Sequence, residues 1–173
     1  MSLLPVYRKS FFSSLERSDG LGLAFRYRRG LVYTDMTVGT AFEGYDDLVH
    51  GGMLFGILDV IMWYAIFLGT KKICMTRKTD MEFLKPVQCD ATYRAQGKLV
   101  RVEDRDVWAI AWIEDRQKER YAQASALFRE AKHLDYDRFI DNFDFTGVSP
   151  RIRKLIVSAS PDPARSSIAG LPE

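Results

Sequence analysis

One carboxylate stands in the middle of one of the most apolar runs of the sequence. The run reads HGGMLFGILDVIMWYAIFLG from residue 50 to 69, and Asp59 is its only acidic residue. An unpaired carboxylate is costly to bury, and burial raises the pKa of a carboxyl group, which makes it a better base near neutral pH. Asp59 is therefore a candidate general base or nucleophile. A carboxylate paired with a buried Arg or Tyr is the purely structural alternative.

The residues that open this run suggest a partner for the carboxylate. His50 is followed by Gly51 and Gly52. The first N–H groups of a helix have no internal acceptor and attract negative charge, and glycine lets a ligand approach the backbone closely. Gly51 is thus a candidate donor to an oxygen that gains charge during a reaction, although a glycine pair also suits a tight turn into a helix. We interpret His50 as a residue that orients this turn rather than as a catalyst.

A long helix that is apolar on all sides must position these residues. We expect it to run from His50 to about residue 69, where Gly69 is a candidate C-cap. A rise of about 1.5 Å per residue places Asp59 about 13 Å from His50, so the two cannot meet within one chain. Residues 51–69 are also close to the length of a membrane span, but an acid at the centre of a span is costly. We predict a helix buried inside a folded domain instead.

Strand-like segments on both sides of the helix supply the sheet that buries it. Residues 23–27 alternate and are followed by a break at 29–30 and a β-rich run at 31–38, which predicts a hairpin. Four more runs follow the helix, separated by short polar turns, and predict an antiparallel meander. They are residues 75–84, 91–102, 107–113 and 121–128.

Two of these four runs carry informative side chains. In the first, strict alternation places Thr76 on one face and Met81 and Phe83 on the other, and Pro86 ends the strand. In the last, small side chains at every second position let the apolar helix approach the sheet closely. These side chains are Ala122, Ala124 and Ala126.

The bulk composition is that of one globular domain. The 173 residues are 47% hydrophobic, which suffices for a sizeable core, and the net charge of +2 is too small to indicate a nucleic-acid partner. Cys74 and Cys89 have no spacing typical of a metal site, so we expect two reduced core thiols and no metal. The first twelve residues lack a continuous apolar stretch, so we expect no signal peptide and a cytoplasmic location.

The C-terminal part of the sequence has a different character. Residues 132–157 predict one or two surface helices, the second of which begins at Ser149-Pro150. Residues 158–173 are rich in Ser, Pro, Ala and Gly, which predicts a disordered or loosely packed tail. We therefore divide the chain into a main domain, 1–131, and a C-terminal helical extension with a flexible tail, 132–173.

The order of elements resembles that of the hotdog-fold acyl-CoA thioesterases, in particular the branch of phenylacetic-acid-pathway and THEM-type enzymes. The likeness covers about residues 19–130. It rests on FEG at 42–44, HGG at 50–52, Asp59 nine residues after His50, TRKTDMEFLKPV at 76–87 and ASALFRE at 124–130. The resemblance implies an α+β fold in which an antiparallel sheet wraps around one long buried helix.

The same resemblance implies a function and a set of site residues. The chain would hydrolyse an acyl-CoA or acyl carrier protein thioester without a cofactor. Asp59 would be the base, the Gly51 N–H the oxyanion donor, and Thr76 the residue that positions the water or the base, while His50 and Gly52 would shape the substrate site. It also implies a homodimer or a dimer of dimers, with each site formed between the helix of one protomer and the helix start of the other. An ordinary solvent-facing residue is the alternative for Thr76.

Several alternatives stay open at this point. Some relatives carry an Asn six residues before the histidine, where this chain has Gly44. The missing donor favours a second hypothesis, a non-catalytic module that binds acyl-CoA or a lipid-like ligand, whereas Asp59 and Thr76 favour the enzyme. A dehydratase of the same fold is less favoured, because the Pro-rich helix start of those relatives is absent.

Two further sets of residues have no assigned role. Coenzyme A phosphates require cations, and the candidates are Arg77, Lys78, Lys85, Arg101 and Arg105, with a second cluster at Arg26, Arg28 and Arg29. The aromatic residues of the helix could floor an acyl site or belong to the core. They are Trp63, Tyr64 and Phe67.

Overall fold

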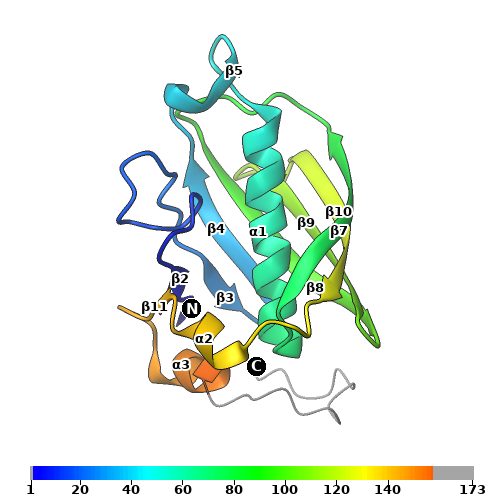
Figure 1. The fold of residues 1–173 in the computed structure, drawn as a ribbon. Helices are drawn as coiled ribbons and strands as arrows, with labels where there is room; N and C mark the ends of the chain where they lie inside the picture. Colours follow the sequence, from blue (N-terminus) through cyan, green and yellow to red (C-terminus); the bar gives the residue numbers. More distant parts are fainter. Residues whose placement is uncertain (1, 158–173) are drawn as a thin grey trace.

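A seven-stranded antiparallel sheet curves around a long helix in this computed structural model, which describes residues 2–157 (Figure 1). The helix, α1, spans Gly51–Thr70. The strands, in their order across the sheet, are β1 (Ser2–Leu3), β3 (Arg26–Arg28), β4 (Leu31–Thr37), β8 (Thr92–Glu103), β9 (Asp106–Glu114), β10 (Arg120–Glu130) and β7 (Cys74–Phe83). The predicted α+β class, with a sheet wrapped around one long buried helix, is confirmed, and so is the hairpin formed by β3 and β4.

Small residues on the inner face of the sheet allow α1 to lie close to it. The predicted alanines of β10 are all buried, and Ala109 and Ala111 continue the strip of small residues on β9. The approach is especially close at Gly97 of β8, where an added Cβ would lie 2.7 Å from Ile61 Cγ2 and 2.8 Å from the Ile110 carbonyl oxygen. Those distances leave no room for a side chain, so the glycine sets the depth at which the helix packs.

The order of the strands corrects the predicted four-strand meander. Strands β8, β9 and β10 form a meander of three, whereas β7 pairs with β10 at the edge of the sheet. The N–H groups of Leu84 and Lys85 both donate to the Tyr121 carbonyl oxygen, at 2.8 and 3.0 Å. The chain is therefore still held beside β10 when β7 ends, and it passes the start of α1 before it enters β8. Within residues 2–157, no other strand pairs with the outer edge of β7.

The C-terminal end of α1 also differs from the prediction. Gly69 lies inside the helix, and the left-handed cap is Lys71, with φ of 62° and its N–H donating to the Phe67 carbonyl oxygen. A Cβ at Gly69 would lie 2.7 Å from Leu99 Cδ2. This glycine therefore serves the packing of helix against sheet rather than the cap.

The C-terminal extension covers the second half of α1. It contains α2 (Tyr136–Ile140), β11 (Phe143–Asp144) and α3 (Pro150–Val157), and β11 pairs with β2 (Val6–Tyr7). Trp63 stacks on Phe67 with ring centroids 4.9 Å apart, and Phe139 and Phe143 lie about as close, at 5.8 to 6.2 Å. Tyr64 and Phe67 therefore belong to the core, and Trp63 packs against it. The predicted tail, 158–173, lies outside the described residues.

The start of α1 is preceded by a small hairpin. A 3₁₀ turn at Thr40–Phe42 leads into β5 (Glu43–Tyr45) and β6 (Leu48–Val49), which pair with each other.

By length and composition α1 could cross a membrane, but more than half of its most apolar window is buried inside the fold, as in the core helix of a folded domain.

Candidate active site around Asp59

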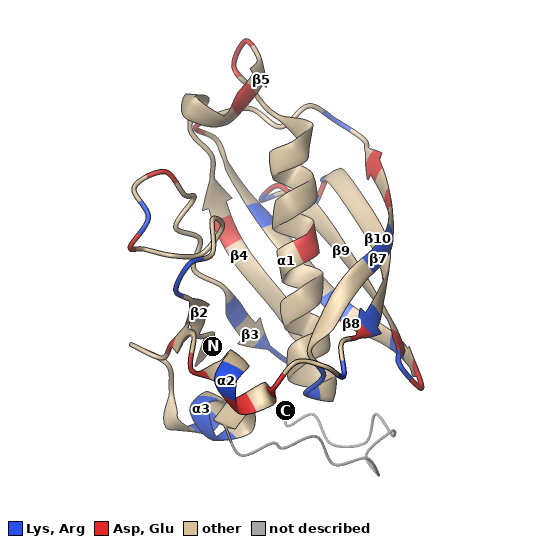
Figure 2. Ribbon diagram, in the orientation of Figure 1, with Lys and Arg blue, Asp and Glu red and all other residues tan. Residues whose placement is uncertain are grey.

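Asp59 is the one acidic position on α1, and it lies on the part of the helix that the sheet does not cover (Figure 2). The carboxylate is half-buried, and its Oδ1 accepts a hydrogen bond of 2.7 Å from Thr76 Oγ1. Burial raises the pKa of Asp59, and the hydrogen bond from Thr76 opposes this shift. Among residues 2–157, no Arg, Lys or Tyr side chain pairs with Asp59. Within the described part of the chain, the structural alternative of a carboxylate neutralised by a buried Arg or Tyr is therefore not found.

A β-bulge turns Thr76 towards the helix. Between β10 and β7, Leu127 is opposite Lys78 and the next residue, Phe128, is opposite Thr76, so Arg77 is an extra residue in β7. One extra residue reverses the alternation of side chains along a strand. Thr76 therefore faces α1, on the same side as Met81 and Phe83, and the prediction that it lies on the opposite face was wrong.

The start of α1 has one free backbone donor. His50 is the N-cap, and its Nδ1 accepts a hydrogen bond of 2.9 Å from the Gly52 N–H. The ring nitrogen that accepts this bond carries no proton. The Gly51 N–H has no recorded acceptor within residues 2–157. Of the two glycines, Gly51 is thus the one with a donor left for a ligand, while Gly52 and His50 satisfy each other.

Position 44 must be a glycine for a structural reason that the sequence alone did not reveal. A Cβ at this position would lie 3.0 Å from both Cα and Cδ2 of His50. The histidine ring can take its capping position because β5 presents no side chain there. An asparagine in place of Gly44 would require the β5–β6 hairpin to move away from His50, so the absence of the Asn donor is built into this cap.

The candidate base and the free donor lie far apart along one helix. Gly51 and Asp59 are eight residues apart in a continuous helix, which corresponds to about 12 Å. Strand β7 runs beside both of them. Thr76 contacts Asp59 near one end of the strand, and the Phe83 ring lies 3.2 Å from the position of an added Cβ on Gly51 near the other end. One chain therefore holds two candidate half-sites, both beside β7.

The surface around these half-sites is apolar and open. Phe55 of α1 is 40% exposed and Phe83 of β7 is 57% exposed, while Met75, next to Thr76, is exposed on the opposite face of the strand. Next to them, the outer edge of β7 presents unpaired backbone groups over ten residues. A long, unpaired edge strand beside exposed apolar side chains is a template for pairing with another chain.

The basic residues that are candidates for binding coenzyme A phosphates form other contacts, and the two cysteines are buried. Lys78, Lys85 and Arg101 form ion pairs with Asp80, Glu119 and Glu103, and Arg105 donates to the Glu130 carbonyl oxygen. Cys74 and Cys89 are both buried and free. A surface groove of about 480 Å³ lies over β7, β9 and β10, where Trp112, Gln123 and Glu82 line it, away from Asp59.

The chain is similar to known proteins in sequence and in fold. The model of the thioesterase superfamily matches residues 47–107. An uncharacterized protein of Schizosaccharomyces pombe, C26H8.11c, is 27% identical over 107 residues, which are 58% of this chain and 60% of that protein. The chain thus spans about 60% of the length of this curated relative.

Three solved structures share the fold at low sequence identity. RHA08564, a thioesterase superfamily protein, has a TM-score of 0.68 and 21% identity over 71% of this chain and 61% of that one. The PaaI protein of E. coli has a TM-score of 0.56 and 19% identity over 64% and 80%. A hypothetical thioesterase of Streptococcus pneumoniae, solved with coenzyme A, has a TM-score of 0.58 and 20% identity over 69% and 93%.

Proposed function

Because the chain has the hotdog fold of the thioesterase superfamily, we propose that it hydrolyses an acyl thioester of coenzyme A, with an acyl carrier protein thioester as the second substrate class. The observation that carries the proposal is Asp59, a half-buried carboxylate without a cation that is held by Thr76 on an uncovered part of the helix. Neighbours of the same fold solved with acetyl-CoA and with coenzyme A support the choice of coenzyme.

The proposed reaction begins with a water molecule beside Asp59. The carboxylate takes one proton from the water while the water oxygen attacks the thioester carbonyl carbon. The oxyanion that forms accepts a hydrogen bond from a Gly51 N–H at a helix start, where the dipole favours negative charge. When the C–S bond breaks, the coenzyme thiolate takes the proton back from Asp59. Thr76 keeps the carboxylate in place throughout.

A homodimer brings the two half-sites together. On β7, Thr76 contacts Asp59, and the Phe83 ring lies next to Gly51. If two β7 strands pair antiparallel around a two-fold axis at residue 80, residues 79 and 81 lie opposite each other, and the extra residue in the bulge brings Thr76 of one protomer opposite Phe83 of the other. Asp59 then faces the partner's Gly51. The same pairing covers the unpaired edge of β7, and a dimer of dimers is compatible with it.

Mixing two inactive variants tests both the chemistry and the shared site. Asp59→Asn removes the base, and Gly51→Pro removes the donor. In a reassembled 1:1 mixture, half of the dimers are mixed, and each mixed dimer has one intact site if base and donor come from different protomers. Thiol release from acyl-CoA should then recover to about a quarter of the wild-type rate. A mixture that stays as inactive as its components would refute the shared site.

The binding module is the second candidate function, because Gly44 leaves the site with one evident backbone donor. A binding module would bind acyl-CoA saturably and release no thiol over many hours. A wild-type protein that turns over acyl-CoA, and loses turnover in Asp59→Asn but not binding, would exclude it.

A further inference from the structure

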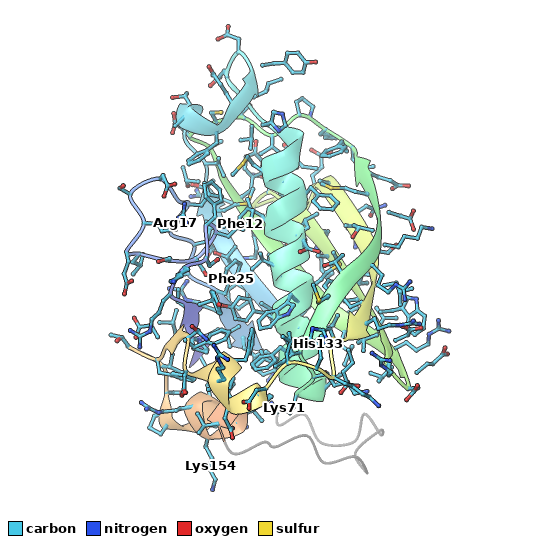
Figure 3. The ribbon with its side chains drawn as sticks, in the orientation of Figure 1. Phe12, Arg17, Phe25, Lys71, His133 and Lys154 are labelled. Carbon is cyan, nitrogen blue, oxygen red and sulfur yellow. The ribbon has the colours of Figure 1, made fainter. Side chains whose placement is uncertain are left out.

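An aromatic ring from the N-terminal segment lies on the face of α1 that carries Asp59. Residues 8–23 cross beside the helix, and Phe12 points from this segment towards α1 (Figure 3). A Cβ added to Gly56 would lie only 2.2 Å from Phe12 Cζ and 2.8 Å from Cε1. The ring therefore occupies the space that any other residue at position 56 would fill.

The position of Gly56 places this ring beside the candidate base. Gly56 is three residues before Asp59, so the two share one face of the helix about one turn apart. Thr76 contacts Asp59 from β7, which lies on the other side of α1 from the N-terminal segment (Figure 1). The uncovered strip of helix around Asp59 is thus bordered by β7 on one side and by Phe12 on the other.

Phe12 is held by a loop and not by the sheet. Its carbonyl oxygen accepts a bond of 2.8 Å from the Leu23 N–H, and the Phe11 carbonyl accepts one of 2.9 Å from the Leu21 N–H. The Phe12 N–H donates to Ser10 Oγ, and the Phe11 and Phe12 rings meet edge to face at 5.3 Å. The ring itself is only half-buried. The loop thus holds the Phe12 ring in place. Because the ring comes from a loop, its removal takes no residue from the sheet or from α1.

On the basis of the proposed function, we propose that Phe12 limits the size of the acyl group that reaches Asp59. A thioester carbonyl placed at Asp59 must direct its acyl group along the apolar strip of α1, and the space at Gly56 is taken by the ring. Short acyl groups fit without it, whereas long chains need that space. Gly56 creates the space, and Phe12 fills it, so the pair together determines chain-length selectivity.

The ratio of kcat/KM for dodecanoyl-CoA to kcat/KM for acetyl-CoA measures this selectivity. Phe12→Ala should raise the ratio on the order of tenfold or more, as expected when a site gains room for apolar groups. Adding Gly56→Ala to Phe12→Ala returns a methyl group to the space and should lower the ratio again. Phe11→Ala is the matched control, because it removes the same ring from the same segment but not from Gly56, and its ratio should stay near that of the wild type.

An unchanged ratio in Phe12→Ala, or an equal rise in Phe11→Ala, would overturn the inference. Thermal unfolding of each variant verifies that it is folded. If the wild type releases no thiol from any acyl-CoA, the proposed hydrolysis has failed and the ligands stay intact. The inference is then tested by equilibrium titration with the same two acyl-CoAs. The relative affinity for dodecanoyl-CoA must rise in Phe12→Ala and not in Phe11→Ala, and a rise in neither or in both would refute it.

Discussion

Replacing Gly51 by proline removes one backbone N–H group and leaves the helix start otherwise suited to the new residue. Position 51 is the first residue of α1, where proline is favoured because its missing N–H has no intrahelical acceptor. His50 has φ of −58° and ψ of 131°, the extended conformation that a residue before proline prefers. The hydrogen bond from Gly52 to His50 Nδ1 does not involve the Gly51 nitrogen. The substitution therefore changes one donor and little else.

The expected loss follows from the role of that donor. Removal of one oxyanion donor lowers kcat by about 10²–10³-fold, or about 2.7–4 kcal/mol of transition-state stabilisation. Because this chain shows one backbone donor at the site, we expect the effect at the upper end of that range. Ground-state affinity for the thioester should change much less, because a neutral carbonyl oxygen accepts a weaker hydrogen bond than an oxyanion.

Gly51→Ala supplies the matched control. Alanine keeps the N–H, and its Cβ meets the Phe83 ring at 3.2 Å as the proline Cβ would. Both variants are assayed for thiol release from acyl-CoA with a thiol-reactive dye. The chain's own thiols, Cys74 and Cys89, are buried and contribute little background. Equal kcat values for the proline and alanine variants would show that the Gly51 N–H has no part in catalysis.

Three other substitutions test Asp59, its hydrogen-bond partner Thr76 and the packing of α1 on the sheet. Asp59→Asn should lower kcat on the order of 10²–10⁴-fold. Because burial raises the pKa of Asp59, the ionised carboxylate opposes folding, so the melting temperature of Asp59→Asn at neutral pH should equal or exceed that of the wild type. Any gain should vanish as the pH falls through the pKa of Asp59. A clear loss of melting temperature in the variant would contradict this. Thr76→Val removes the hydrogen bond that lowers the pKa of Asp59, so the acid limb of the pH profile of kcat/KM should move to higher pH, and an unmoved limb would exclude Asp59 as the titrating group. Gly97→Ala should lower the free energy of unfolding in urea by about 1–3 kcal/mol because its methyl group collides with Ile61, and an unchanged unfolding midpoint would refute the close packing described above.

The elements with strong local patterns could be predicted from the sequence. The apolar run gave α1 to within about one residue at each end, and the alternating runs gave the hairpin and the last three strands. Asp59 could be singled out because a charge in such a run conflicts with its surroundings. The alanines of β10 indicated the face on which the helix packs, and that face is buried.

The features that could not be predicted from the sequence depend on contacts between distant segments. The bulge at Arg77 exists only in the register between β7 and β10, and no property of residues 75–84 taken alone reveals it. The position of β7 at the sheet edge depends on the path of residues 84–91 past the start of α1. Likewise, the close approach of Phe12 to Gly56 joins residues 44 positions apart. A glycine in the middle of an apolar helix was the one available signal for it.

The short ladder between β2 and β11 has a consequence for synthesis of the protein. It joins Val6 and Tyr7 to Phe143 and Asp144, so one partner leaves the ribosome long before the other. Until residue 144 has emerged, the rings of Trp63 and Phe67 lack their cover of Phe139 and Phe143. Nascent chains shorter than this therefore expose an aromatic surface to chaperones and to one another, and truncation anywhere before this point should yield an aggregating product rather than a smaller folded protein.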